Sequence, residues 1–472
     1  MRALLAAVMS GILFFLSQGV ADVWPLGWLA PMPLLWFAYG DAPRWQVFLA
    51  SLAGFALGQA YLAQCYWGQL PPAVIVPLIV AMSVTFAIAV VFSGEALRRG
   101  SSWGTLVAFP ALYTALEYLI GIVSPHGSFG ALGYAQVSFP AGVQVAALFG
   151  VHAVTFLLCL CANAVALLLR RRWTQGGAGI ALCALALVCG LVRLAEAEGA
   201  RVRVAALADT ETRNAQHRQH TLASEETAAQ TYATYIGQLK DVRVVAIPEG
   251  AVQMQAGDEN VVLAPLAAAA RASGATVVVG TFTPEPAQNR AFVFLPDGTV
   301  ETYEKRHLLA PFETEIPGRD PGFLGAGYAT QICKDMDFAG TVRATAGHVV
   351  RLMIVPADDF GRDKWIHARM AVMRGIENGF AVLRSAFDGL ETISDAQGRV
   401  LVSAPTSQAG MVAVQADVPL GSGPTLYTRV GDLFPYVCAL LSFLVGARML
   451  VWKRVRRTIA HLLVAPSTDD PV

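Results

Sequence analysis

The chain has 472 residues, of which 55% are hydrophobic and 14% charged, and its mean hydropathy is +0.50. These values are too apolar for a soluble globular protein and too charged for a bundle buried entirely in lipid. The 34 Lys and Arg residues balance the 34 Asp and Glu residues, and no long basic or acidic run occurs. The composition therefore argues against a nucleic acid partner.

Eight segments are predicted to cross a membrane, because each approaches the roughly 20 mainly apolar residues that a spanning helix needs. Seven of them precede residue 196, and the eighth follows the charged part of the chain. The first is interpreted as a retained helix, since no convincing small-residue cleavage site follows it. The segments lie near residues 3–20, 24–40, 46–66, 73–94, 104–123, 143–169, 178–195 and 432–452.

The loops between these segments differ in charge. One set is basic, whereas the alternate loops near 21–23, 67–72 and 124–142 contain no Lys or Arg. Because basic loops favour the cytoplasm, we expect a multi-pass protein of the inner membrane with its charged domain on the periplasmic side. The basic set comprises Arg2, Arg44, Arg98, Arg99, Arg170, Arg171, Arg172, Lys453, Arg454, Arg456 and Arg457.

One carboxylate, Glu117, falls inside a predicted span. A carboxylate in hydrocarbon is costly unless it faces protein or water. It indicates either a functional site or a hydrogen bond between helices, and the sequence leaves both interpretations open.

The chain is expected to have three parts: a seven-span bundle at 1–195, a catalytic domain at 196–430, and a last transmembrane helix with a basic cytoplasmic tail at 431–472. Within the second part, predicted strands alternate with predicted helices, which favours an α/β domain. The strands are expected near 201–209, 242–247, 275–282, 291–295, 300–303, 328–333, 352–356 and 381–384, and the helices near 217–240, 259–273, 340–350 and 363–378.

Three of the predicted strands end at residues suited to acyl transfer. Glu249 follows one buried strand, Lys305 follows the hairpin at 291–303, and Cys333 ends another strand. Strand ends are where layered α/β folds meet their ligands. A thiol is a weak nucleophile until a base takes its proton, and an ammonium group stabilises both thiolate and oxyanion. Each residue taken alone also has a simpler interpretation. Glu249 fits a carboxylate at a helix start, Lys305 a solvated surface charge, and Cys333 a small buried residue.

The cysteines do not suggest disulfides or metal binding. Of the seven, only Cys333 lies in the predicted soluble part, and their spacing does not match a metal site. No nucleotide motif occurs either. The sequence therefore predicts no cofactor and no metal.

The segments around the three residues resemble a known superfamily. IPEG around Glu249, YEKRHLLAPFE around Lys305, ICKDMDF around Cys333 and MRGIENG at 373–379 resemble the nitrilase, or carbon–nitrogen hydrolase, superfamily. Seven spans before such a domain and one after it resemble bacterial apolipoprotein N-acyltransferases. FPALYTALEYL, LGYAQ and TLYTRVGDLFPY also look like segments of that family, so the resemblance covers essentially the whole chain.

The resemblance implies a membrane bundle of eight spans joined to a nitrilase-like α-β-β-α sandwich. It implies a triad in which Glu249 is the general base, Lys305 the oxyanion stabiliser and Cys333 the nucleophile. The cysteine would take an acyl chain from a membrane phospholipid as a thioester. The N-terminal amine of a diacylglyceryl-cysteine lipoprotein would then accept it as an amide. The implied partners are thus the phospholipid donor, the lipoprotein acceptor and the lipid bilayer.

The chain departs from this family in two places. The usual PFGE-like segment reads Pro-Phe-Glu-Thr-Glu from residue 311, so either Glu313 or Glu315 is the supporting carboxylate, with Glu313 favoured. After the cysteine, Lys334 and Asp335 replace the usual aromatic residue and Glu, and Asp335 is expected to take the role of that Glu.

Two aromatic residues, Phe360 and Trp365, fall where the family has a loop near the active site, and they are candidates for the substrate entrance. Packing against a helix start is the alternative interpretation of both residues. For the whole chain, two other functions stay open. One is a membrane-tethered carbon–nitrogen hydrolase (amidase), in which water resolves the acyl-enzyme, and the other is a catalytically silent scaffold.

Overall fold

The computed structural model describes residues 1–196, 199–218, 221–310, 312–408 and 410–463. Side chains from residue 452 onward lie outside the described part. The side chains of Lys453, Arg454, Arg456 and Arg457 in the predicted basic tail are therefore not described.

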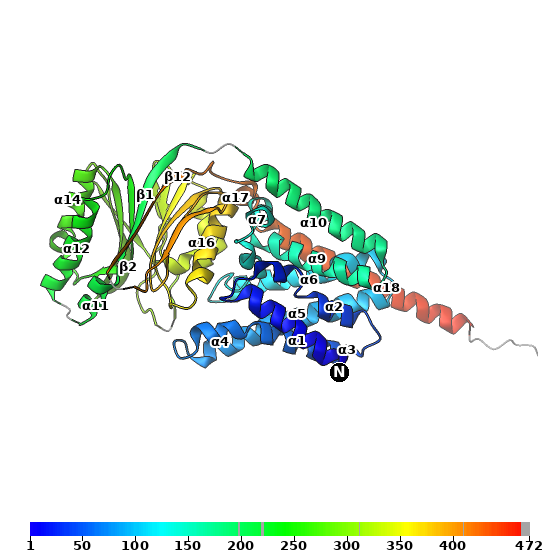
Figure 1. Ribbon diagram of the computed structural model, residues 1–472. Coiled ribbons are helices and arrows are strands. Elements are labelled where there is room, and N and C mark those ends of the chain that lie inside the picture. Colours follow the sequence, from blue (N-terminus) through cyan, green and yellow to red (C-terminus); the bar gives the residue numbers. More distant parts are fainter. Residues whose placement is uncertain (197–198, 219–220, 311, 409, 464–472) are drawn as a thin grey trace, which may run out of the picture.

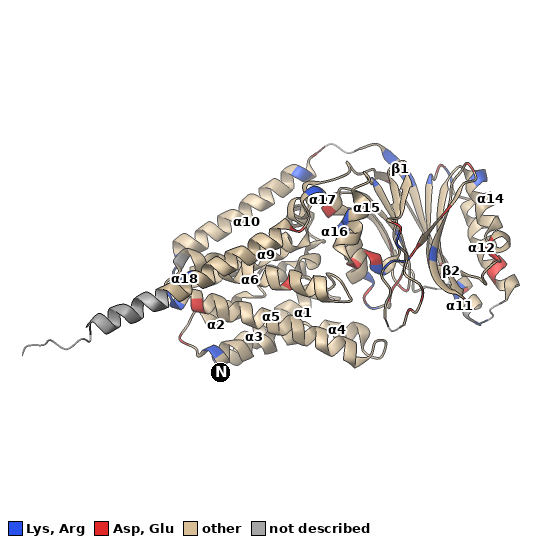
Figure 2. Cartoon of the chain, turned by 180° about the vertical axis from the view of Figure 1, so that it is seen from behind, with Lys and Arg blue, Asp and Glu red and all other residues tan. Residues whose placement is uncertain are grey.

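Figure 1 shows two regions side by side, a helical bundle and an α/β domain. Charged residues are sparse along the helices of the bundle and frequent in the α/β domain (Figure 2). The helical region comprises α1 (Arg2–Gln18), η1 (Trp24–Trp28), α2 (Met32–Ala38), α3 (Arg44–Gly58), α4 (Ala60–Tyr66), α5 (Pro72–Arg98), α6 (Ser102–Val123), η2 (Leu132–Gln136), α7 (Pro140–Val143), α8 (Ala146–Phe149), α9 (Val151–Leu169), α10 (Trp173–Leu194) and α18 (Leu433–Leu463).

Six of the described helices are long and apolar enough to cross a membrane. The prediction of eight such helices is not confirmed. The first predicted span, α1, has only 17 residues. The second, at 24–40, is wrong as a single helix, because prolines at 25, 31 and 33 divide it into η1 and α2. The six are Arg44–Tyr66, Pro72–Arg98, Trp103–Val123, Val151–Leu169, Trp173–Leu194 and Leu433–Val451.

The α/β domain contains two six-stranded sheets, in the orders β12-β1-β2-β3-β4-β5 and β11-β10-β9-β8-β7-β6. The first sheet is formed by β1 (Arg201–Asp209), β2 (Val244–Gln253), β3 (Thr276–Pro284), β4 (Ala287–Phe294), β5 (Val300–Glu304) and β12 (Met411–Pro419). The second is formed by β6 (Phe323–Gly325), β7 (Tyr328–Thr330), β8 (Leu352–Asp358), β9 (Ala381–Phe387), β10 (Leu390–Ser394) and β11 (Val400–Pro405).

The sheets pack face to face through buried aliphatic side chains, including Val244 and Val278 of one sheet and Ile354 and Leu383 of the other. Helices α11 (Thr210–Arg218), α12 (Leu222–Ile236), α13 (Glu259–Val262) and α14 (Ala264–Ser273) lie on the outer side of the first sheet, as Figure 1 shows. Helices α15 (Ala339–Ala346) and α16 (Lys364–Asn378) lie on the outer side of the second, as Figure 2 shows. This arrangement is the expected α-β-β-α sandwich.

The centre of each sheet is parallel, with β1 beside β2 and β2 beside β3 in one sheet, and β7 beside β8 and β8 beside β9 in the other. Parallel strands bring their carboxyl ends to the same edge. That edge carries the candidate site.

Helix α16 docks the sandwich onto the bundle. The fully buried Arg374 guanidinium on this helix bonds to the Tyr134 hydroxyl and the Glu377 carboxylate, and Glu377 accepts a bond of 2.7 Å from the N–H of Val151. The short helix α17 (Leu426–Val430) then leads into α18. Because a buried polar or charged group left without its partner costs about 1–3 kcal/mol, the bonds from Arg374 to Tyr134 and from Val151 to Glu377 fix the two regions against each other.

The buried Glu117 carboxylate is used within the bundle. It accepts hydrogen bonds from the Leu132 N–H (2.9 Å) and the Thr155 hydroxyl (2.8 Å), and it lies 3.0 Å from His152 Nδ1. These contacts fit the interhelical interpretation of Glu117.

Candidate active site

Glu249 lies on β2 where the pairing with β3 is interrupted. The register shifts between Ile247 and Val252, and the next residue, Gly250, has a φ of +64°. Opposite it, a Cβ on Gly280 would lie 2.4 Å from the Cα of Glu249. Only glycine therefore permits this close approach, which turns the Glu249 side chain out of the regular ladder.

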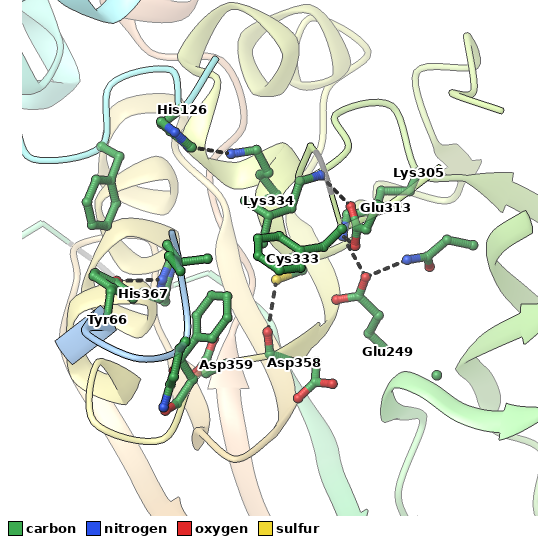
Figure 3. Close-up of a pocket in the computed structure, with 18 of the residues that line it drawn as sticks. Tyr66, His126, Glu249, Lys305, Glu313, Cys333, Lys334, Asp358, Asp359 and His367 are labelled. Atoms are coloured by element: carbon green, nitrogen blue, oxygen red, sulfur yellow. Dashed lines mark hydrogen bonds and ion pairs between the residues drawn. The ribbon is translucent and has the colours of Figure 1, made fainter. Parts of the chain in front are cut away.

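Lys305 directly follows β5, and its side chain is 2% exposed. Its Nζ lies 2.7 Å from Glu249 Oε1 and 2.5 Å from Glu313 Oε1. Asn289 on β4 donates a bond of 2.6 Å to the same oxygen of Glu249. The second oxygen of Glu313 accepts a bond of 2.6 Å from the N–H of Leu309. Figure 3 shows the ammonium group held between the two carboxylates.

Cys333 opens the 3-10 helix η3 (Cys333–Asp337), directly after the two-residue loop that follows β7. Its φ of +41° is unusual for a residue with a side chain, and such strain is concentrated at functional sites. The half-buried thiol donates a weak bond of 3.5 Å to the carbonyl oxygen of Asp358 at the end of β8. In Figure 3 the sulfur lies in the centre of the cluster, with Lys305 and Glu249 to one side.

Asp335 joins the chain segments that carry Lys305 and Cys333. Its fully buried carboxylate accepts bonds from the N–H groups of Arg306 (3.1 Å) and His307 (2.8 Å), which follow Lys305. It also accepts bonds from the N–H of Ile332 (3.1 Å), which precedes Cys333, and from the hydroxyl of Tyr303 (2.8 Å). The predicted supporting residue is therefore a structural link between the two.

The site favours a protonated lysine and a protonated thiol at rest. Burial lowers the pKa of Lys305, but the charges of the Glu249 and Glu313 carboxylates outweigh it and hold the pKa well above its ordinary value. Burial, together with the nearby Glu249 carboxylate, raises the pKa of the Cys333 thiol well above its ordinary value. A reaction at the sulfur therefore needs a base that takes its proton during the attack.

A cavity of about 730 Å³ connects this cluster with the bundle. Glu249, Lys305, Glu313 and Cys333 line its polar end. The opposite wall is apolar and comes from α4, the loop after it, α5 and the loop after α6: Leu62, Leu70, Val74, Ile75, Leu78 and Phe129. This wall continues toward helices of membrane-spanning length, which suits the hydrocarbon chain of a lipid.

The other predicted residues are divided between the cavity and the docking interface. Glu315 lines the cavity, but of the two candidate carboxylates it is Glu313 that contacts Lys305. Phe360 lines the cavity and packs edge-on against Tyr66 at 5.5 Å between ring centroids. Trp365 instead donates a bond of 2.9 Å from its indole to Asp22 of the bundle.

Several residues at the site were not predicted from the sequence. His126, Asn289 and His367 all line the cavity. His367 lies 2.8 Å from the Asp363 carboxylate; burial lowers its pKa, but Asp363 and other carboxylates raise it to about 9. Asn289 had no signal in the sequence, because it precedes the hairpin strand predicted at 291–295 and lies on β4 only in the structure. Among the described residues, no group of three or more His, Cys, Asp and Glu is placed to hold a metal ion.

Comparisons with known proteins agree with the resemblance seen in the sequence. Residues 10–164 match the family described as apolipoprotein N-acyltransferase N-terminal domain. The chain is 27% identical to the apolipoprotein N-acyltransferase of Geobacter metallireducens, over 98% of this chain and 96% of that one. It is 29% identical to the corresponding Methylococcus capsulatus protein, over 92% and 93% of the two chains.

Among solved structures, an amidase from Nesterenkonia sp. aligns with 50% of this chain and 95% of its own length, with 20% identity and a TM-score of 0.39. The sequence comparisons confirm the resemblance to apolipoprotein N-acyltransferases along nearly the whole chain. Together with the six long apolar helices, they identify a membrane protein.

Proposed function

We propose that this chain is an N-acyltransferase that moves an acyl chain from a membrane phospholipid to the N-terminal amine of a diacylglyceryl-cysteine lipoprotein. The observation that carries the proposal is the single cavity in which Cys333, Lys305 and Glu249 share walls with apolar residues of α4 and α5. The full-length relatives named apolipoprotein N-acyltransferase support the same reaction.

In the first half-reaction, Glu249 takes the proton of the Cys333 thiol as the sulfur attacks the ester carbonyl carbon of the phospholipid. The negative charge that develops on the carbonyl oxygen is stabilised by the Lys305 ammonium. The Asp335 N–H donates to the Ile332 carbonyl and makes the first hydrogen bond of η3, so we propose the two N–H groups before it, those of Cys333 and Lys334, as further donors for this oxygen. The intermediate expels the lysophospholipid alkoxide, which receives the proton from Glu249, and leaves a thioester on Cys333.

In the second half-reaction, the free amine of the lipoprotein attacks the thioester carbonyl carbon. Glu249 takes one proton from the attacking nitrogen and returns it to the departing sulfur, so that the thiol is regenerated and an amide is formed. Glu249 thus serves as base and acid in turn. Glu313 contacts Lys305 on its other side and keeps it protonated throughout.

The proposed orientation places the α/β domain on the periplasmic side of the inner membrane. Arg44 and Arg98 both bond to Glu95, at 2.7 and 2.9 Å. Figure 2 shows charged residues gathered at the end of the bundle remote from the α/β domain. Basic loops favour the cytoplasmic side, which supports this orientation. A reporter inserted near Pro286 should behave as external, and the opposite result would overturn the orientation.

The reaction is tested by supplying a phospholipid with a labelled sn-1 chain and a diacylglyceryl-cysteine lipopeptide to the purified protein. The wild type should transfer label to the peptide, and Cys333→Ala should transfer none. Cys189→Ala, which removes an exposed thiol on α10, is the matched control and should retain transfer. Release of the label as free fatty acid in place of acylated peptide would favour the hydrolase instead.

A further inference from the structure

Besides His126, four basic side chains line the cavity: Arg213, Lys305, Lys334 and His367. Three of them are paired with carboxylates: Arg213 with Asp358 and Asp388, Lys305 with Glu249 and Glu313, and His367 with Asp363. In the part of the chain that the structure describes, Lys334 has no carboxylate within ion-pair distance. It therefore differs from the other three.

The partner of Lys334 is a neutral group. The side chain is 7% exposed, and its Nζ lies 3.1 Å from Nδ1 of His126 in the loop after α6. Burial and the Lys334 charge lower the pKa of His126 to about 4, so near neutral pH the imidazole is uncharged and accepts the bond. The Phe338 ring lies 5.9 Å from the same Nζ.

The nearby Asp337 acts on Lys334 only at longer range, and burial raises the pKa of Asp337, which disfavours its charged form. Burial likewise lowers the pKa of Lys334. A buried cation without a counter-charge is costly, and an anion brought by a ligand would relieve that cost. The positive charge of Lys334 therefore stays without a counter-charge until an anion binds.

The position of Lys334 indicates which anion that is. Lys334 directly follows Cys333, and Figure 3 shows its side chain running from the nucleophile to His126 on the bundle side of the cavity. When a phospholipid ester lies at the sulfur and its acyl chain lies along α4 and α5, only the glycerol backbone separates the ester from the phosphate. A lysine side chain on the adjacent residue spans that separation.

We infer that Lys334 binds the phosphodiester of the acyl donor, with His126 holding its ammonium group in place. The inference rests on the proposed function and adds a positioning residue for one substrate. It assigns Lys334 to recognition of the donor rather than to activation of the sulfur.

The test compares two acyl donors that share a palmitoyl chain, a phospholipid and the uncharged p-nitrophenyl palmitate. Acylation of Cys333 is followed by intact mass for the first donor and by the p-nitrophenolate burst for the second. Lys334→Met should raise the half-saturating phospholipid concentration roughly 10- to 100-fold, the loss expected for one hydrogen bond to a charged group. The burst from the ester should stay unchanged.

The matched control is Lys240→Met, which removes the same charge from an exposed position after α12 and should change neither donor. If Lys334→Met slows acylation equally with both donors, Lys334 acts on the thiol. If Lys334→Met leaves the half-saturating phospholipid concentration unchanged, Lys334 binds no phosphate. Either result overturns the inference. Wild-type protein that is acylated by the ester but not by the phospholipid would instead contradict the proposed function.

Inorganic phosphate in large excess separates a lipid headgroup from a free phosphate as the ligand. We expect acylation by phospholipid to be unaffected, because the acyl chain delivers the headgroup to Lys334. Inhibition by phosphate in the wild type that is absent in Lys334→Met would assign the site to free phosphate and overturn the headgroup assignment.

Discussion

Replacing Asp335 with Asn tests whether this carboxylate holds Lys305 and Cys333 in register. The change keeps the shape of the side chain but replaces one acceptor oxygen with an NH2 group. The Oδ1 side accepts from the N–H groups of Arg306 and His307 and lies 3.0 Å from His307 Nδ1, and the Oδ2 side accepts from Tyr303 and Ile332.

The free-energy cost of Asp335→Asn depends on whether each hydrogen-bond donor still finds an acceptor. The amide oxygen keeps the three contacts on the Oδ1 side but without the charge that strengthens them, a loss of roughly 1–2 kcal/mol in total. On the other side the Tyr303 hydroxyl can rotate to accept from the new NH2, but the Ile332 N–H cannot and is left buried and unsatisfied, at about 1–3 kcal/mol. We expect a local destabilisation of about 3 kcal/mol, which corresponds to roughly 100-fold in an opening equilibrium.

Amide hydrogen exchange measures this local opening directly. In Asp335→Asn, protection of the Arg306, His307 and Ile332 amides should fall by roughly 100-fold. The matched control is Asp337→Asn, two residues further on. Burial raises the pKa of Asp337, which disfavours its charged form, so we expect a neutral amide at this position to change protection little.

Two results would refute this reasoning. Unchanged protection in Asp335→Asn would mean that the five contacts do not hold the two segments together. An equal loss in Asp337→Asn would mean that any buried carboxylate in η3 has the same effect, so that Asp335 has no special role as a link.

Three further predictions concern the reaction itself. Glu249→Gln should slow acylation of Cys333 by roughly 10²- to 10⁴-fold, the usual contribution of a general base, in burst kinetics; a smaller change would assign the base elsewhere. Glu313→Gln removes one of the charges that raise the pKa of Lys305, so the alkaline limb of the pH–rate profile should move to lower pH. The control Glu301→Gln on β5 should leave this limb in place. An unmoved limb in Glu313→Gln would contradict the role of Glu313 in raising the pKa of Lys305. Leu78→Trp should fill the apolar end of the cavity and slow acylation by palmitoyl esters but not by acetyl esters. The control is Val76→Trp, at a residue that is 48% exposed, which should slow neither reaction. Equal slowing of both esters by Leu78→Trp would contradict the acyl-chain assignment.

The strands that carry the candidate site could be predicted because their signal is local. The run of small and β-branched residues at Val244–Ile247 is buried on both faces, and such runs indicate central strands without tertiary information. The position of Glu249 at the end of this run, and of Lys305 after a hairpin, followed from the same pattern. The sequence did not show that β12 returns to pair with β1, because that pairing joins residues about 200 positions apart.

The second predicted span failed for a reason visible in the residues. A count of apolar residues over 24–40 passes over Pro25, Pro31 and Pro33, each of which lacks the N–H that a continuous helix needs. The contact between His126 and Lys334 could not be predicted at all, since it depends on how a loop of the bundle meets the sandwich. The same holds for the cavity as a whole, which combines α4 and α5 of the bundle with β2 and η3 of the sandwich.

The most direct test of the account is the mass of the protein after incubation with a phospholipid that carries palmitate only at sn-1. We predict a palmitoyl adduct that maps to the Cys333 peptide, is cleaved by hydroxylamine as a thioester is, and disappears when a diacylated lipopeptide is added. Acylation of the lipopeptide without any adduct on Cys333, or with an adduct on another residue, would contradict the account.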